Sequence, residues 1–414
     1  MFPTSRNFPP FQIVGPSTTC VCSRGYLPVQ SSLVCSFFTC CLESTGRVLQ
    51  NISKSYPEKM SQKPPLHIIL DSDMGTDDLM ALTNICHHAR TNENVKLEAI
   101  SLVKGLQLCV KNAADLLVRF HKATNFLSNG NGSICPIFMG FEGRMDPPNS
   151  NCFSEADWYQ QYDFERIHSD LANLLNLPQI ESNDSMPVVV NSENYVTEMM
   201  ELLRKAPDNY FTLLCIGPLT NIAKLIECDR SLAYSKIQQV LIMGGALRVK
   251  ELANQQNGSE WNFYCDGKAA KMVIQAFGEK IKLFDLSVAN LNVIEEKNRA
   301  EYEQLINKEN TQDSPIVKLR KELLKITMES ASYDTSTSCY LFYPEMFTFE
   351  KYQVVVFGEK PNEGVIKKAE SDEELMQSTT INCATSIDKD NFFIIVKGLL
   401  SDTSEYYSCC KFGL

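Results

Sequence analysis

The chain has 414 residues, of which 44% are hydrophobic and 21% charged, as is typical of a globular protein with one large or two ordinary domains. Its formal net charge of −11 argues against a nucleic-acid-binding protein, which usually carries a basic face. No apolar run approaches the roughly 20 residues that a transmembrane helix needs, so we expect no membrane partner either.

The first 59 residues differ in composition from the rest of the chain. They are rich in Ser, Pro, Cys and Phe, and their only acids are Glu43 and Glu58. Scarce acids leave a transit peptide open, whereas the run SSLVCSFFTCC is too polar and too far along the chain for a secretory signal. We expect residues 1–59 to be an extension, disordered or outside the fold because of a wrong start, and residues 60–414 to form one domain.

The cysteines indicate the redox compartment. Five of the sixteen precede residue 60, and the others are scattered without a CxxC pair or a zinc-like spacing with histidine. Scattered cysteines in a large chain usually are reduced, buried thiols of the cytosol. We therefore expect a cytoplasmic protein.

After residue 60, short apolar runs alternate with stretches of helical pattern. The runs are LHIIL (66–70), LEAISLV (97–103), CPIFM (135–139), FTLLCI (211–216), QQVLIM (238–243), IKLFDL (281–286) and YQVVVF (352–357). The helical stretches are 77–90, 110–126, 195–205, 220–227, 267–277 and 314–332. Continuous apolar runs fit strands buried on both faces, so the alternation predicts an α/β fold with a mainly parallel central sheet flanked by helices.

The first predicted strand leads into an acidic cluster, LHIILDSDMGTDD, which contains Asp71, Asp73, Asp77 and Asp78. In a parallel sheet, ligands bind beyond the carboxyl ends of the strands. Four carboxylates so close together repel one another, and a hard cation such as Ca²⁺ or Mg²⁺ would relieve the repulsion. Helix capping is the alternative, but a cap needs one acid rather than four.

Two other aspartate motifs fit this stretch poorly. Counted from Asp71, an EF-hand loop would need glycine at the sixth position and glutamate at the twelfth, where Thr76 and Leu82 stand. Phosphatases of the haloacid dehalogenase type also place Asp-x-Asp after a strand. They expect Thr or Val two residues after the second aspartate, and here that residue is Gly75.

The cluster DSDMGTDD resembles the N-terminal signature of the inosine–uridine-preferring nucleoside hydrolase family. Four later segments are similar to further motifs of that family, in the same order, so that the resemblance spans most of residues 66–356. They are LLCIGPLTNIAKLI (213–226), QQVLIMGGAL (238–247), NQQNGSEWNFYCDGKAA (254–270) and YDTSTSCYLFYPEMFTFEKYQVVV (333–356).

The resemblance implies a Rossmann-like nucleoside hydrolase fold, a homodimer or homotetramer, and hydrolysis of the N-glycosidic bond of ribonucleosides to ribose and a free base, as in purine salvage. It implies Ca²⁺ held by the carboxylates of Asp73, Asp78 and Asp334 and by the backbone carbonyl of Ile216. The ion would also bind the ribose 2′- and 3′-hydroxyls and orient a water, whose proton Asp73 would accept.

The same resemblance implies a ribose site. Asp77 would hold a ribose hydroxyl, Met243 would lie beneath the sugar, and Asp71 would fix the acidic loop from behind. The other residues gripping the ribose would be Asn254, Glu260 and Asn262. Because Glu260 and Asn262 are two positions apart, we expect them to face the same way in an extended stretch.

Several of these residues have a simpler alternative. Asn254 lies in a Gln/Asn/Gly loop and could be a turn residue, while Glu260 and Asn262 could be exposed on the surface. Asp334 could be a helix N-cap. Met243 could belong to the core.

The chain departs from the family pattern in the leaving-group region. Leu106 replaces an asparagine that touches the metal-bound water and the substrate, and Tyr333 replaces a histidine that can protonate the leaving base. A phenol with a pKa near 10 is a weaker acid at neutral pH, although it can donate a hydrogen bond. Trp261 replaces a phenylalanine and could stack on the base.

The family's H-G-x-D-G loop motif is missing as well. Trp158, Tyr159 and Tyr162 lie in the corresponding region, 141–185, where they could close over the base or form an amphipathic helix. Two hypotheses follow. The chain is an active Ca²⁺-dependent ribohydrolase, with Tyr333 acting on the leaving base, or it is a catalytically weak metal- and ribose-binding relative with a structural role.

Overall fold

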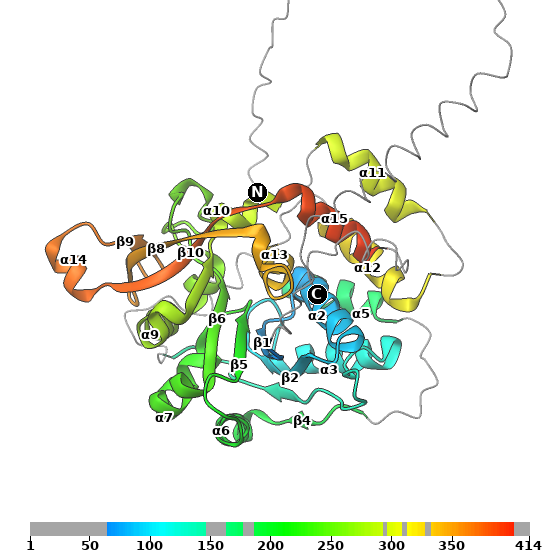
Figure 1. The fold of residues 1–414 in the computed structure, drawn as a ribbon, viewed down its shortest axis with the longest axis horizontal. Helices are drawn as coiled ribbons and strands as arrows, with labels where there is room; N and C mark the ends of the chain where they lie inside the picture. The colour runs from blue at the N-terminus through cyan, green and yellow to red at the C-terminus, as the bar shows by residue number, and fades with distance from the viewer. Residues whose placement is uncertain are drawn as a thin grey trace, which may run out of the picture. The chain divides into compact units, whose positions relative to one another are not determined.

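The computed structural model describes residues 64–145, 163–176, 186–292, 296–308, 313–327 and 333–400. Within them, ten strands form one sheet in the order β4-β3-β2-β1-β5-β6-β7-β10-β8-β9 (Figure 1). The strands are β1 Leu66–Ser72, β2 Val95–Leu102, β3 Ile137–Met139, β4 Val189–Val190, β5 Phe211–Cys215, β6 Ile237–Met243, β7 Ile281–Phe284, β8 Phe347–Val356, β9 Ile366–Lys368 and β10 Thr379–Ile387. All pairings are parallel except those of β8 with β10 and with β9.

Helices cover both faces of this sheet (Figure 1). They are α2 Thr76–Thr91, α3 Val110–Thr124, α5 Phe164–Leu174, α6 Tyr195–Lys205, α7 Thr220–Lys236, α8 Trp261–Cys265, α9 Gly267–Phe277, α10 Leu286–Ala289, α11 Glu296–Asn307, α12 Pro315–Thr327, α13 Tyr333–Tyr340, α14 Asp372–Gln377 and α15 Lys389–Leu399. The predicted α/β class and the mainly parallel central sheet are therefore confirmed.

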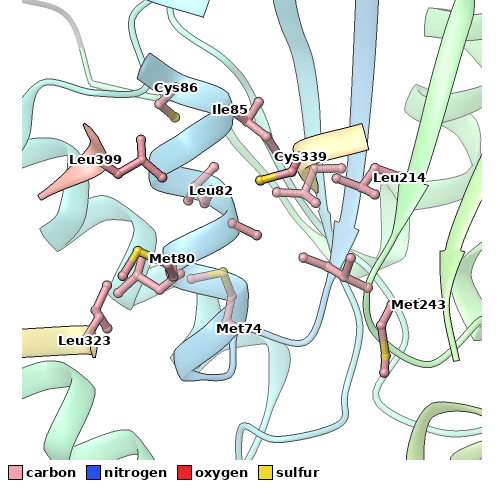
Figure 2. Close-up of a cluster of buried hydrophobic side chains, with 14 of the residues drawn as sticks. Met74, Met80, Leu82, Ile85, Cys86, Leu214, Met243, Leu323, Cys339 and Leu399 are labelled. Atoms are coloured by element: carbon pink, nitrogen blue, oxygen red, sulfur yellow. The ribbon is translucent and has the colours of Figure 1, made fainter. Parts of the chain in front are cut away.

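The core consists of two large clusters of buried side chains. One lies among α2, α3, α12, α13 and α15, and the other lies beneath α6, α7 and α9. Figure 2 shows part of the first cluster, where Met80 of α2, Leu323 of α12 and Leu399 of α15 lie along the side of α2 that faces away from the sheet. Helix α2 is anchored by this core, and its N-terminus carries the acidic cluster.

Each of the seven predicted strands is present, and each of the six predicted helices has a counterpart in the described residues. The prediction for 220–227 was too short, because α7 continues to Lys236 beyond a non-helical Asp229. Strand β10 was not predicted, although it pairs with β7 and lies inside the sheet. Its sequence, TTINCATSI, mixes polar and apolar residues and lacks the continuous apolar pattern of the other central strands.

The N-terminal extension, residues 1–59, lies outside the described residues and stays a prediction. We predict that a chain beginning at Met60 folds like the full-length protein, because composition changes there and β1 begins at Leu66. Thermal unfolding followed by circular dichroism should give the same midpoint for both chains. An insoluble shortened chain beside a soluble full-length chain would show that the extension contributes to folding.

Candidate active site

The acidic loop lies where the order of the sheet reverses. From β1 the chain moves outward through β2, β3 and β4, and it then returns to place β5 on the other side of β1. Such a reversal opens a crevice at the carboxyl ends of the two strands, and ligands of open α/β sheets bind there. The acidic loop follows β1, and Ile216 follows β5, so both lie at this crevice.

A cavity of about 240 Å³ occupies this position. It is lined by every residue to which the sequence assigned a catalytic, substrate-binding or metal-binding role: Asp73, Asp77, Asp78, Ile216, Met243, Asn254, Glu260, Trp261, Asn262, Tyr333 and Asp334. Leu106 lines it too, together with three residues that the sequence did not single out, Thr76, Ile167 and Ile326. The structure thus brings the eleven assigned residues together from five separate segments of the chain.

Carboxylates converge at one end of the cavity. Oxygen atoms of Asp77, Asp78 and Asp334 lie within 4.8 Å of one another, although Asp334 is 256 positions after Asp78. Asp78 also shares hydrogen bonds with Asp73 and Asp334. Asp334 is the second residue of α13 rather than its N-cap, and its side chain is buried against this group.

Burial makes this cluster electrostatically unfavourable without a cation. Desolvation, followed by the neighbouring charges, raises the pKa of Asp73 and of Asp334 well above the usual range. Desolvation and Asp78 likewise raise the pKa of Asp77 to about 7. The pKa of Asp78 is raised by burial and lowered in part by its hydrogen bonds. A set of clustered oxygen donors of this kind fits a hard divalent cation, which would stabilise all the ionised forms at once.

Local hydrogen bonds hold the loop between β1 and α2. The hydroxyl of Ser72 donates to Asp78 Oδ1 at 2.6 Å, and the backbone N–H of Gly75 donates to Asp78 Oδ2 at 3.0 Å. Met74 adopts a positive φ of 57°, which is uncommon for a residue with a side chain. Asp77 and Asp78 lie in the first turn of α2, where the helix dipole favours negative charge.

Asp71 lies behind the cavity and is fully buried. Its Oδ1 accepts from the hydroxyl of Ser101 at 2.5 Å and from Asn221 Nδ2 at 2.9 Å, while Ser101 also contacts the hydroxyl of Tyr195. Burial raises the pKa of Asp71 to about 7 against these lowering contacts. Asn221 further donates to Leu102 O at 3.0 Å, so one amide ties β1 and β2 to the start of α7.

The segment around Glu260 differs from the prediction. It is not extended, because residues 261–265 form helix α8 and Glu260 is its N-cap. The Glu260 carboxylate accepts from the backbone N–H groups of Asn262, Phe263 and Gly245 at 2.9, 3.2 and 3.0 Å. Surface exposure was also a wrong alternative, since Glu260 is 2% and Asn262 5% exposed.

Asn262 connects two strand ends at the cavity floor. Its Nδ2 donates to the carbonyl oxygens of Ile216 and Met243 at 3.1 and 3.2 Å. A carbonyl oxygen has two lone pairs, so Ile216 retains one for a further ligand. Asn254 lies at the exposed rim, where its Oδ1 accepts from Gln255 Nε2 at 3.2 Å.

Comparison with known proteins identifies the family. The family model described as inosine-uridine preferring nucleoside hydrolase matches residues 68–394. The chain belongs to this family. It is similar to the pyrimidine-specific ribonucleoside hydrolase RihA of Salmonella newport, with 29% identity over 161 residues, 36% of this chain and 48% of that protein. With RihA of Photobacterium profundum the identity is 25% over 291 residues, 68% of this chain and 81% of the relative.

The alignment to the first of these relatives thus spans about half of its length. Solved nucleoside hydrolases share the fold. The inosine-uridine preferring enzyme of Bacillus anthracis has a TM-score of 0.61 at 17% identity, covering 81% of this chain and 99% of that one. An inosine-guanosine nucleoside hydrolase has a TM-score of 0.59 at 20% identity, covering 81% and 98%. The Rossmann-like nucleoside hydrolase fold is confirmed.

This nucleoside hydrolase chain departs from the family motifs at Leu106, Trp261 and Tyr333, which line the cavity beside the acids. Ile167 and Ile326 add apolar side chains to the same cavity. Trp261 packs in a cluster with Phe164 of α5 and with Leu106. Within region 141–185, residues 146–162 lie outside the described residues. Trp158, Tyr159 and Tyr162 are among them, so both alternatives for these side chains stay predictions.

Tyr333 is half-buried beside the carboxylates. Its hydroxyl donates to Asn290 Oδ1 at 3.5 Å. Burial raises the pKa of Tyr333, and the nearby Asp77, Glu260 and Asp334 raise it further. In this environment the phenol is therefore a weaker acid than a free tyrosine.

The backbone at Leu106 supplies a contact that its side chain does not. The N–H of Leu106 donates to Asp73 Oδ2 at 3.0 Å. Gly105 makes this approach possible, because a Cβ at that position would overlap the carboxylate of Asp73.

We predict that Gly105→Ala lowers kcat/KM about 10²-fold, since displacing a reacting group by about 1 Å has an effect of that size. Steady-state kinetics beside a thermal unfolding measurement would show it. Gly358→Ala is the matched control. The nearest atom to its new Cβ is the Cα of Lys268, at 3.3 Å, and neither residue belongs to the acidic cluster. Equal activity of both variants would mean that Asp73 tolerates movement.

Proposed function

We propose that this chain catalyses the Ca²⁺-dependent hydrolysis of ribonucleosides to ribose and a free base. The observation that supports this most is that Asp73, Asp77, Asp78 and Asp334 line one cavity at the β1/β5 crevice, with oxygen atoms of the last three within 4.8 Å of one another. The family membership supplies the reaction class. Relatives and solved structures are named for pyrimidine, purine and inosine substrates, so family membership alone does not identify the preferred base.

The acidic end would hold both the metal and the sugar. Asp73, Asp78, Asp334 and the carbonyl of Ile216 would hold Ca²⁺, an ion that takes six to eight oxygen ligands. When bound, it would orient a water, lower its pKa and bind the ribose 2′- and 3′-hydroxyls. Asp77 would accept a hydrogen bond from a ribose hydroxyl.

The chain's own groups would then assist bond cleavage. Asp73 would take the proton of the attacking water as general base. The surrounding carboxylates would stabilise the positive charge that develops on the ribose ring. Met243 and Asn262 would form the floor beneath the sugar, while Asn254 and Glu260 would contribute at its edge. Trp261 and Tyr333 would face the base.

A second candidate is a metal- and ribose-binding relative with little turnover. Leu106 and Tyr333 favour it, because the metal-binding acids are complete while the leaving-group positions are changed. The two candidates predict the same ligand but different rates.

A base-release assay separates them. The protein would be incubated with inosine, guanosine, adenosine, uridine and cytidine, with Ca²⁺ or with EDTA, and free base would be quantified by chromatography. Calorimetric titration with Ca²⁺ provides a readout independent of turnover. Ca²⁺ binding with Ca²⁺-dependent release supports the enzyme. Ca²⁺ binding without release of base supports the second candidate. A protein that neither binds Ca²⁺ nor releases base would overturn both candidates.

The protein's setting is part of the same proposal. We propose a cytoplasmic homodimer or homotetramer. Six of the eight cysteines in the described residues are buried, as expected for a protein of a reducing compartment. Among the helices of the described ranges, none has the length and apolar character needed to cross a bilayer.

A further inference from the structure

The cavity places aromatic rings beside a group of acids. Trp261 and Tyr333 line it together with Asp73, Asp77, Asp78 and Asp334. Aromatic faces attract cations, tryptophan most strongly, and the attraction grows when the ring and the cation are shielded from water. Trp261 is 5% exposed and Tyr333 half-buried, so both rings are shielded in this way.

The acids carry more charge than one metal ion balances. When a divalent cation holds all four aspartates ionised, they supply four negative charges, of which the cation compensates two. The other two produce a negative potential in the cavity, which concentrates positively charged ligands. The acidic group and the aromatic rings therefore favour the same kind of ligand.

The side chains at the leaving-group positions also favour a cationic base. Leu106 presents hydrocarbon to the cavity, and the hydroxyl of Tyr333 already donates to Asn290 Oδ1 at 3.5 Å. A neutral nucleobase departs as an anion unless it gains a proton. A base with a permanent positive charge departs as a neutral molecule and needs none.

We propose that the preferred substrates of this site are ribosides whose base is permanently cationic, either N-ribosylpyridinium compounds or N7-alkylated purine nucleosides. The proposal rests on the function proposed above and specifies its substrate class. Water attacks C1′, the bond between C1′ and the ring nitrogen breaks, and its electron pair neutralises the base. Asp73 takes the proton of the water, so that the products are ribose, a neutral base and one proton.

The first test compares matched substrates. We would measure kcat/KM for 7-methylguanosine and guanosine, and for nicotinamide riboside and uridine, and divide each by its uncatalysed rate constant, because cationic ribosides are intrinsically labile. The expected result is a normalised rate at least about tenfold higher for the cationic member of each pair. Preference in one pair only would identify which kind of cationic base fits. Equal or lower values in both pairs would overturn the proposal.

A charge variant tests the cause. Ile326 lines the cavity and is 49% exposed, so a lysine there should be tolerated by the fold. Relative to Ile326→Gln, which changes polarity without charge, Ile326→Lys should lower the ratio of kcat/KM for 7-methylguanosine to kcat/KM for guanosine at least fivefold. A parallel loss for both substrates would contradict an electrostatic origin.

The outcomes separate this inference from the function on which it rests. Hydrolysis of guanosine and 7-methylguanosine with equal normalised rates overturns the cationic preference and leaves the hydrolase standing. A protein that binds Ca²⁺ and releases base from neither substrate overturns the hydrolase itself.

Discussion

Asp78→Asn and Asp334→Asn should each reduce nucleoside hydrolysis by at least about 10³-fold, because each removes a charged ligand from the proposed metal site. Metal catalysis contributes several kcal/mol to a barrier, and each 1.36 kcal/mol is tenfold in rate. Asparagine keeps the shape of the side chain, so the loss would report on charge. Asp115→Asn, an exposed residue of α3, is the matched control.

Without a metal ion, the same variants should be more stable to unfolding than the wild type, although they are less active. In EDTA, Asp78→Asn should raise the midpoint of thermal unfolding, because it removes a buried charge that raises the pKa of Asp73 and of Asp334. In the wild type, Ca²⁺ at 100 times its Kd should stabilise the fold by about 2.7 kcal/mol. The variant should lose most of this increase. If it retained both the Ca²⁺-induced shift and the activity, these aspartates would not be metal ligands.

The second large effect is expected at the leaving-group positions. Tyr333→His introduces a group with a pKa near 6.5, which is suited to donate a proton near neutrality. General acid catalysis is worth about 10²–10⁴-fold, so turnover of inosine or uridine should rise if departure of the base limits the rate. Leu106→Asn should add a hydrogen bond to the water, and the double variant should exceed either single change.

Two control measurements accompany the prediction for Tyr333 and Leu106. A Tyr333→Phe variant removes the hydroxyl without adding an acid, and it should not raise turnover. Ca²⁺ titration would verify that each variant keeps its metal site. Unchanged hydrolysis in the double variant, with Ca²⁺ still bound, would show that these two positions do not set the rate, and it would direct attention to region 141–185.

Much of this architecture was predictable because its signals are local. A central parallel strand is buried on both faces, so it leaves a continuous apolar run such as LHIIL, and the acids at its end mark the sheet edge. Strand β10 escaped prediction because it lies between β7 and the antiparallel β8 and contains Asn382 and Ser386 among its apolar residues. The position of β10 in the sheet depends on its pairing with β7 and β8 rather than on its own hydrophobic pattern.

The site was predictable as a set of residues but not as a set of contacts. The motifs identified every proposed ligand, and the fold collected them in one cavity. The motifs did not show that Glu260 caps α8, because that depends on a helix beginning at Trp261. They did not show that Asn221 ties two strands to α7 either, because its partners, Asp71 and Leu102, are distant in sequence. The block GPLTNIA contained the signal for Asn221, and only the fold shows what this amide holds.

The distance along the chain between Asp78 and Asp334 has a consequence for biosynthesis. A ribosome adds about 5–20 residues per second, so roughly 13 to 50 seconds separate the appearance of α2 from that of α13. During that interval the nascent chain carries the acids after β1 without the residue that completes their group. The proposed cation site therefore becomes complete only late in translation, after the strands from β1 to β7 have been made.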